Sequence, residues 1–179
     1  QPAASAVAIR WMKSRIHQVL EELENQFEEF RLSEALMNLY RLVWDDFCSW
    51  YLELVKPPYG EPMDAKTLAE TKNILGDLLK MLHPFMPFQT EEIWHWVEER
   101  LGPEEALCIA AWPEKGAYEA DLLEAATAFQ QIVTEVRNIR KENQIPMRDA
   151  LELSVQVGSA YPEAFESAVV KLGNLNSIQ

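Results

Sequence analysis

The stretch RWMKSRIHQ, residues 10–18, combines the side-chain types that bind single-stranded nucleic acid. It contains the cations Arg10, Lys13 and Arg15, the aromatic Trp11 and no acid, although the whole chain has a formal net charge of -13. An exposed indole offers a base a stacking surface worth roughly 1–3 kcal/mol, and cations neutralise phosphates. These residues are the first candidates for a chemical role, and that role is binding rather than catalysis.

The helix that carries these side chains has one apolar stripe. Over residues 6–29, apolar residues recur at three- and four-residue steps, as in an amphipathic helix: Ile9, Met12, Ile16, Val19, Leu20, Leu23 and Phe27. Since each residue turns a helix by about 100°, Trp11 is predicted to face away from the stripe, toward solvent, near Ser14 and Gln18. The candidate binding residues are Arg10, Trp11, Lys13, Ser14, Arg15 and Gln18. The alternative is that Trp11 packs on another helix.

A second basic group occurs late in the chain. Arg137, Arg140 and Lys141 are spaced so that they share one face of a helix. Ion pairs with carboxylates of this acidic chain are the favoured interpretation, and contact with a phosphate stays open.

Residues for catalysis or metal binding are few. The three histidines lie far apart, with no cysteine or carboxylate at metal-ligand spacing, so a zinc site is not expected. The chain has six glycines and no glycine-rich phosphate loop. The sequence therefore predicts no catalytic residue, no metal site and no cofactor in this chain.

The length and composition are typical of one compact, water-soluble domain, or of one such domain with a small appendage. A chain of 179 residues is long enough to bury one core. The two cysteines, Cys48 and Cys108, have apolar neighbours and are expected to be reduced core thiols of a cytoplasmic protein. No apolar run approaches the roughly 20 residues that cross a bilayer. The acidic balance argues against general attraction to nucleic acid.

Hydrophobic periodicity divides the chain into helices with short connections. Helices are predicted over residues 6–29, 33–56, 64–82, 90–100, 119–143 and 162–172, and a strand over 151–157. Ser33 and Thr90 are the expected N-caps. The helix over 33–56 is apolar on two sides, so we expect it at the centre of the molecule. The predicted fold class is mainly α: an up-and-down helix bundle with a small α/β appendage at the C-terminal end.

The predicted strand determines how we divide the chain. A lone strand is not stable, so LELSVQV needs a partner, either from residues 106–111 or from chain beyond Gln179. We expect a helix bundle over 6–115 and, over 116–179, the fifth long helix with a truncated strand-helix appendage. The opening QPAASAV has neither cap nor periodicity, so it does not enter the fold prediction.

Four segments, in this order, resemble the C-terminal anticodon-binding region of the valyl-tRNA synthetases, which are class I aminoacyl-tRNA synthetases. They are VWDDFCSWYLELVKP (43–57), LLKMLHPFMPFQTEEIW (78–94), AAWP (110–113) and VRNIRKENQIP (136–146). The HPFMPF-TEE-W corner is shared loosely with the isoleucyl and leucyl enzymes, whereas FCSWYLELVKP favours valine. The match covers nearly the whole chain.

The resemblance implies a helix bundle of the class I anticodon-binding type that grips a tRNA anticodon. The parent would be an ATP- and magnesium-dependent valine-tRNA ligase, and its catalytic and editing domains are absent from these 179 residues. The chain alone is then expected to be non-catalytic. Its implied partners are the anticodon stem-loop of tRNA(Val) and the catalytic domain of the parent, with no membrane and no DNA.

The resemblance also bears on the first candidate site. In the family, the helix corresponding to residues 8–20 lines the anticodon site and stacks an aromatic side chain on a base. Trp11 occupies that aromatic position, Arg10, Lys13 and Arg15 would contact phosphates or base edges, and Ser14 or Gln18 could add hydrogen bonds. Two alternatives stay open: a helical protein-docking scaffold without RNA contact, or the equivalent module of an isoleucyl- or leucyl-type synthetase.

Overall fold

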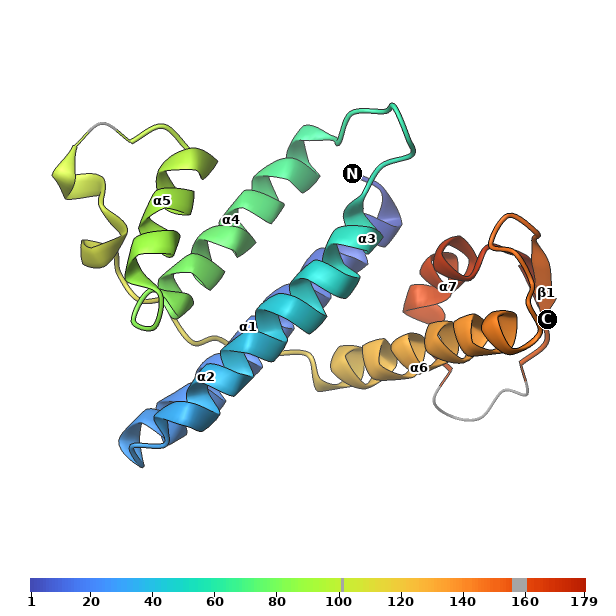
Figure 1. Ribbon diagram of the computed structural model, residues 1–179, viewed down its shortest axis with the longest axis horizontal. Helices are drawn as coiled ribbons and strands as arrows, with labels where there is room; N and C mark the ends of the chain where they lie inside the picture. Colours follow the sequence, from blue (N-terminus) through green and yellow to red (C-terminus); the bar gives the residue numbers. More distant parts are fainter. Residues whose placement is uncertain (101, 156–160) are drawn as a thin grey trace.

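A computed structural model describes residues 1–100, 102–155 and 161–179 of the protein. The elements are α1 (Ala3–Glu28), α2 (Leu32–Arg41), η1 (Leu42–Tyr51), α3 (Leu52–Val55), α4 (Ala65–Leu82), α5 (Pro87–Val97), η2 (Pro103–Glu105), η3 (Leu107–Ile109), α6 (Ala120–Glu142), β1 (Leu151–Leu153), η4 (Glu163–Phe165), α7 (Glu166–Gly173) and β2 (Leu175–Ile178). In Figure 1, α1 and the α2–α3 rod lie side by side, with α4 and α5 on one side and α6, α7 and β1 on the other. The mainly α bundle with a small strand appendage is as predicted.

The central element is α1, and not the helix over 33–56 that we expected at the centre. Helix α1 contacts α2, η1 and α3 along one side, and α4 and α6 elsewhere. It buries small residues such as Ser5, Ala8 and Ser14 beside its apolar stripe, and these permit close approach of several neighbours. The helix also begins at Ala3, so part of the segment that we left out of the prediction is helical.

The second predicted helix forms one continuous rod, but its middle is π-helical. Elements α2, η1 and α3 follow each other without a break, and η1 is a π-helix, a geometry that hydrophobic periodicity does not reveal. Ser33 is not the N-cap: Arg31 holds that position, and its guanidinium pairs with Glu34 at 2.8 Å. The rod buries Leu39, Phe47 and other inner residues, which leaves its opposite face exposed.

Helices α4 and α5 form a hairpin, and their N-termini are stabilised in different ways. Asp64 caps α4, because its carboxylate accepts a hydrogen bond of 3.0 Å from the backbone N–H of Thr67. Helix α5 begins at Pro87, so the predicted cap Thr90 lies inside its first turns. Thr90 is buried, donates to the carbonyl of Met86 at 2.9 Å, and lies 2.8 Å from Nδ1 of His83. Proline at the first helical position replaces the expected cap.

The C-terminal appendage is a parallel two-stranded sheet. Strand β1 pairs with β2, so residues 175–178 supply a partner for the predicted strand, and the expected partner 106–111 does not pair with it. The segment 106–111 instead contains the 3-10 turn η3. Residues 156 and 157 of the predicted strand lie outside the described residues. The division of the chain into 6–115 and 116–179 stays a prediction.

Both cysteines are on the surface, which contradicts the prediction of core thiols. Cys48 and Cys108 are free and exposed. Cys48 lies on η1 near the exposed face of the rod, where an apolar neighbourhood in sequence does not mean burial. Among the described residues, no helix combines the length and hydropathy needed to span a membrane.

Candidate nucleic-acid interface

Trp11 is buried, so the prediction that its ring faces solvent is wrong. Only 3% of the residue is exposed. Trp11 lines a depression of about 420 Å³ between α1, η1 and α6, together with Leu123, Thr127 and Gln130 of α6. The apolar stripe of α1 correctly predicts one buried side, but α6 packs across a second side. The alternative that Trp11 packs on another helix is therefore the correct one.

Ser14 is buried for the same reason. Its Oγ accepts a hydrogen bond of 3.3 Å from the backbone N–H of Glu119, in the segment that leads into α6. Nearby, Nδ1 of His17 accepts a bond of 3.1 Å from the backbone N–H of Gly116. This segment thus runs along the face of α1 that we expected to be free.

The cations of the 10–18 stretch are all paired with acids of this chain. Arg10 forms a two-point pair with Glu119, Lys13 lies 2.6 Å from Glu70, and Arg15 lies 2.8 Å from Asp46. The second guanidinium branch of Arg15 donates to Oε1 of Gln18 at 2.7 Å.

The pKa values of these acids reflect their different surroundings. The hydrogen bond with Arg10 lowers the pKa of Glu119, and the same hydrogen bond and charge raise the pKa of Arg10. Burial raises the pKa of Asp46, and the nearby Arg15 offsets only part of that effect. The cations near the start of α1 are therefore neutralised by acids of the same chain.

The second basic group is divided between interior and surface. Arg140 is buried, with 3% of the residue exposed, and donates to four backbone carbonyls at 2.8–3.1 Å: those of Pro146, Asp149, Gly173 and Asn174. It ties α6 to the appendage and bonds carbonyls rather than carboxylates, so it is not accessible to a phosphate. Arg137 and Lys141 are exposed, and the Arg137 guanidinium lies 5.5 Å from the ring centroid of Trp50.

An exposed aromatic pair with an adjacent cation lies on the outer face of the rod. Tyr40 and Trp44 are 51% and 59% exposed, and their rings stack with centroids 6.4 Å apart and planes at 15°. Arg41 lies between them in sequence and forms no ion pair within the described residues. We call Tyr40, Arg41 and Trp44 the outer platform.

Sequence reasoning missed the outer platform because Tyr40 and Trp44 fit a second apolar stripe of that helix. The signal that could have found it is the combination sought at residues 10–15, an arginine adjacent to an aromatic residue. That combination recurs here on a peripheral helix, whereas α1 is central.

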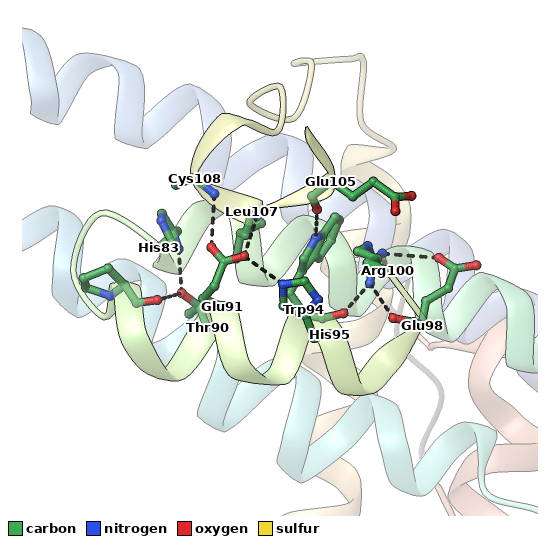
Figure 2. A network of polar contacts seen from close by, with 11 residues as sticks. His83, Thr90, Glu91, Trp94, His95, Glu98, Arg100, Glu105, Leu107 and Cys108 are labelled. Atoms are coloured by element: carbon green, nitrogen blue, oxygen red, sulfur yellow. Dashed lines mark hydrogen bonds and ion pairs between the residues drawn. The ribbon is translucent and has the colours of Figure 1, made fainter. Parts of the chain in front are cut away.

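A polar network joins α5 to the segments before and after it in the chain (Figure 2). The Glu91 carboxylate accepts the backbone N–H groups of Leu107 and Cys108 at 2.8 and 3.2 Å, which pins η3 to α5. Burial would raise the pKa of Glu91, but these two donors, with His83 and His95 nearby, together lower it.

Trp94 joins the same network through both its edge and its ring. Its indole N–H donates to the carbonyl of Glu105 at 2.9 Å, and the Arg100 guanidinium lies 3.7 Å from its ring centroid. The ring also lines a groove of about 690 Å³ between α4 and α5. These contacts hold the segment that contains Glu105, Leu107 and Cys108 against α5, so we interpret the network as structural.

The outer side of α5 is apolar and lies among acids. Phe88 and Trp96 are 86% and 81% exposed, and the Trp96 N–H donates to Glu92 at 3.1 Å. Residues 86–109 contain six acids and one arginine. Within the described residues, no group of three His, Cys, Asp or Glu side chains could hold a metal ion.

Comparisons with known proteins agree with one another. Residues 9–156 match the family model described as the anticodon-binding domain of tRNA ligase. A valine–tRNA ligase of Christiangramia forsetii is 41% identical over 179 residues, all of this chain and 20% of the relative. Those of Porphyromonas gingivalis and Parabacteroides distasonis are 42% and 44% identical over 178 residues, or 99% of this chain. The chain spans about a fifth of the length of these relatives.

Proposed function

Because this chain belongs to the family of anticodon-binding domains of tRNA ligases, we propose that it binds the anticodon stem-loop of tRNA(Val). The match over residues 9–156, together with relatives that are named valine–tRNA ligases, carries the proposal. The chain would select and align the tRNA, so that the acceptor end reaches an active site elsewhere in a longer ligase.

The chemistry of the whole ligase would be carried out outside these 179 residues. ATP and magnesium would bind to the catalytic domain of the parent, in the cytoplasm. In our proposal, these 179 residues take no part in amino-acid activation. This chain alone would be non-catalytic.

The polar side chains of the first candidate set that are exposed or half-buried keep a proposed role in this binding. Arg10, Lys13 and Arg15 could meet a phosphate only by exchanging it for their carboxylate partners. Gln18 is half-buried and lines the same depression as Trp11, and Arg137 and Lys141 are exposed on α6. These residues are secondary contacts in our proposal.

Titration of the 179-residue chain with tRNA(Val) at two salt concentrations tests the proposal. We expect binding that weakens as salt rises, because each phosphate contact releases counterions. A tRNA(Val) with altered anticodon bases is the matched control and should bind more weakly. Equal affinity for both RNAs, or no binding at low salt, would contradict the proposal.

A second partner is favoured by the outer side of α5. The exposed Phe88 and Trp96 lie among acids, which repel RNA but suit a protein surface with an apolar centre and a basic rim. We propose that this side contacts the catalytic domain of the parent. A pure protein-docking scaffold would use the same surface without any RNA contact.

Calorimetry with a separately produced catalytic domain of one of the relatives tests this contact. Trp96→Ala should weaken the association, because Trp96 is among the most exposed apolar side chains of the molecule. Trp44→Ala is the control and should leave it unchanged. The reverse pattern would place the protein contact on the rod.

A further inference from the structure

We propose that the outer platform, Tyr40, Arg41 and Trp44, is the surface on which an unpaired base of the bound RNA stacks. The inference rests on the proposed function and adds the residues that meet the base. It replaces Trp11, of which 3% is exposed, with Trp44, of which 59% is exposed.

The aromatic pair has the accessibility that stacking requires. The Tyr40 and Trp44 rings are nearly parallel, at 15°, so the two side chains support each other on the helix surface. Within the described chain, neither the Tyr40 hydroxyl nor the Trp44 indole N–H has a hydrogen-bond partner. Both polar groups are therefore available to a base or a sugar, while the ring faces offer a sequence-tolerant stacking surface.

Arg41 supplies a cation of the kind that the 10–18 stretch lacks. Every cation of that stretch is held by an acid of this chain, but Arg41 forms no ion pair within the part of the chain that the structure describes. Asp45 is one turn further along and makes no ion pair with it. Glu34, one to two turns before it, is paired with Arg31 at 2.8 Å. Arg41 is thus free to neutralise a phosphate or to stack on a base.

The rod holds this surface in place before any ligand arrives. Further along the same rod, the buried rings of Phe47 and Tyr51 stack with centroids 5.4 Å apart, and the Tyr51 hydroxyl lies 2.8 Å from Oγ1 of Thr71 on α4. The hydroxyl of Ser49 donates to the carbonyl of Trp44 at 2.8 Å, within the π-helical turn. Binding therefore orders little more than side chains, which reduces its entropic cost.

Exposure of a tryptophan alone does not make such a site, and Trp96 illustrates the difference. Trp96 is 81% exposed, more than Trp44, but its N–H is bonded to Glu92 and its surroundings are strongly acidic. The platform combines an exposed ring with donors and a cation that have no partner in the described parts of the chain. Trp96 provides a matched control for the experiment.

The test is a fluorescence-anisotropy titration of the 179-residue chain with a labelled RNA hairpin carrying the valine anticodon loop. Trp44→Ala should weaken binding by about 5- to 150-fold, the range of one lost base–aromatic stack. Trp96→Ala should leave affinity unchanged. Trp44→Leu, which keeps apolar bulk without a ring, should behave like Trp44→Ala, and circular dichroism should show that each variant is folded.

Two further variants separate stacking from charge. Tyr40→Phe should bind nearly as well as the original chain, and Tyr40→Ala should bind more weakly. Arg41→Gln should reduce the slope of log affinity against log salt by about 0.7, the contribution of one phosphate contact to a single strand.

The outcomes distinguish failure of the platform from failure of the proposed function. If the chain binds the hairpin and folded Trp44→Ala binds equally well, the platform is wrong and the proposed function stands. If the chain does not bind the hairpin even at low salt, both fail. If Trp44→Ala instead abolishes self-association seen in sedimentation velocity, with RNA affinity unchanged, the face contacts a second copy and the platform is overturned.

Discussion

The 10–18 stretch of α1 and the outer platform of the rod have similar side chains and opposite environments. Both place a tryptophan near arginine on a helix, but Trp11 is 3% exposed and Trp44 is 59% exposed. The cations of α1 are paired with Glu119, Glu70 and Asp46, whereas Arg41 has no such partner among the described residues. Local composition therefore does not decide whether such a group can bind a ligand. The position of its helix in the fold, central or peripheral, decides it.

The largest expected effect that separates the two regions is on stability. Trp11→Ala should lower the free energy of unfolding by about 3–5 kcal/mol, because it empties a buried site between three elements. Trp44→Ala should lower it by less than about 1 kcal/mol, since the ring is mainly in solvent. Urea denaturation of both variants measures the difference.

A contrary result would reverse the roles of the two tryptophans. If Trp11→Ala were nearly as stable as the original chain and yet lost RNA binding, Trp11 would be the base-stacking residue after all. Trp11→Phe is the control for bulk, and it should retain more of the stability than Trp11→Ala does.

A somewhat smaller stability effect should distinguish the two arginines of α6. Arg140→Met should cost about 2–4 kcal/mol, because hydrogen bonds from a buried charged group to four backbone carbonyls are lost together. Arg137→Met should cost less than about 1 kcal/mol, since Arg137 is exposed. Thermal unfolding measures both, and equal shifts in the two variants would show that Arg140 does not hold the appendage.

Much of the fold follows from the periodicity of the sequence. The predicted helix over 64–82 matches α4 (Ala65–Leu82), and the one over 119–143 matches α6 (Ala120–Glu142), because strong apolar periodicity and flanking breakers define both. The predicted N-caps Ser33 and Thr90 were wrong, because α2 begins at Leu32 and α5 at Pro87, each without a side-chain cap.

The candidate site was harder to predict because its properties depend on distant residues. Whether Trp11 is covered depends on α6, more than 100 residues away in sequence, and whether Arg10 is free depends on Glu119. A single-helix argument has no access to these contacts. The Tyr40–Trp44 face was visible as an apolar stripe, but the sequence did not reveal that both side chains stay exposed among the described residues.

Removing the acids that pair with the cations of α1 should make those cations as available to RNA as Arg41 is. Replacing the acidic partners, as in Glu70→Gln, Asp46→Asn and Glu119→Gln together, should free Lys13, Arg15 and Arg10 for phosphate contacts. RNA affinity should rise, and its salt dependence should steepen by up to about 2, or 0.7 for each contact with a single strand. Anisotropy titrations at several salt concentrations measure this slope.

A change in net charge alone must be separated from this effect. The control replaces three exposed acids that form no ion pair within the described ranges: Glu99→Gln, Glu142→Gln and Glu152→Gln. It has the same net charge as the first triple variant. If both variants gain affinity equally, then long-range charge, rather than release of the α1 cations, explains the gain.

The smallest expected effect is a solvent-induced NMR shift, which reports the exposure of each tryptophan before and after a ligand is added. In the chain labelled with 5-fluorotryptophan, the fluorine resonance of an exposed indole shifts when H₂O is replaced by D₂O, and that of a buried indole does not. Trp44 should show the shift and Trp11 should not, with Trp44→Phe and Trp11→Phe used to assign the two signals. Adding the anticodon hairpin should then suppress the solvent shift of Trp44 and leave that of Trp96 unchanged, because a stacked base excludes water from one ring face. A solvent shift at Trp11 that the hairpin suppresses would return the binding site to α1.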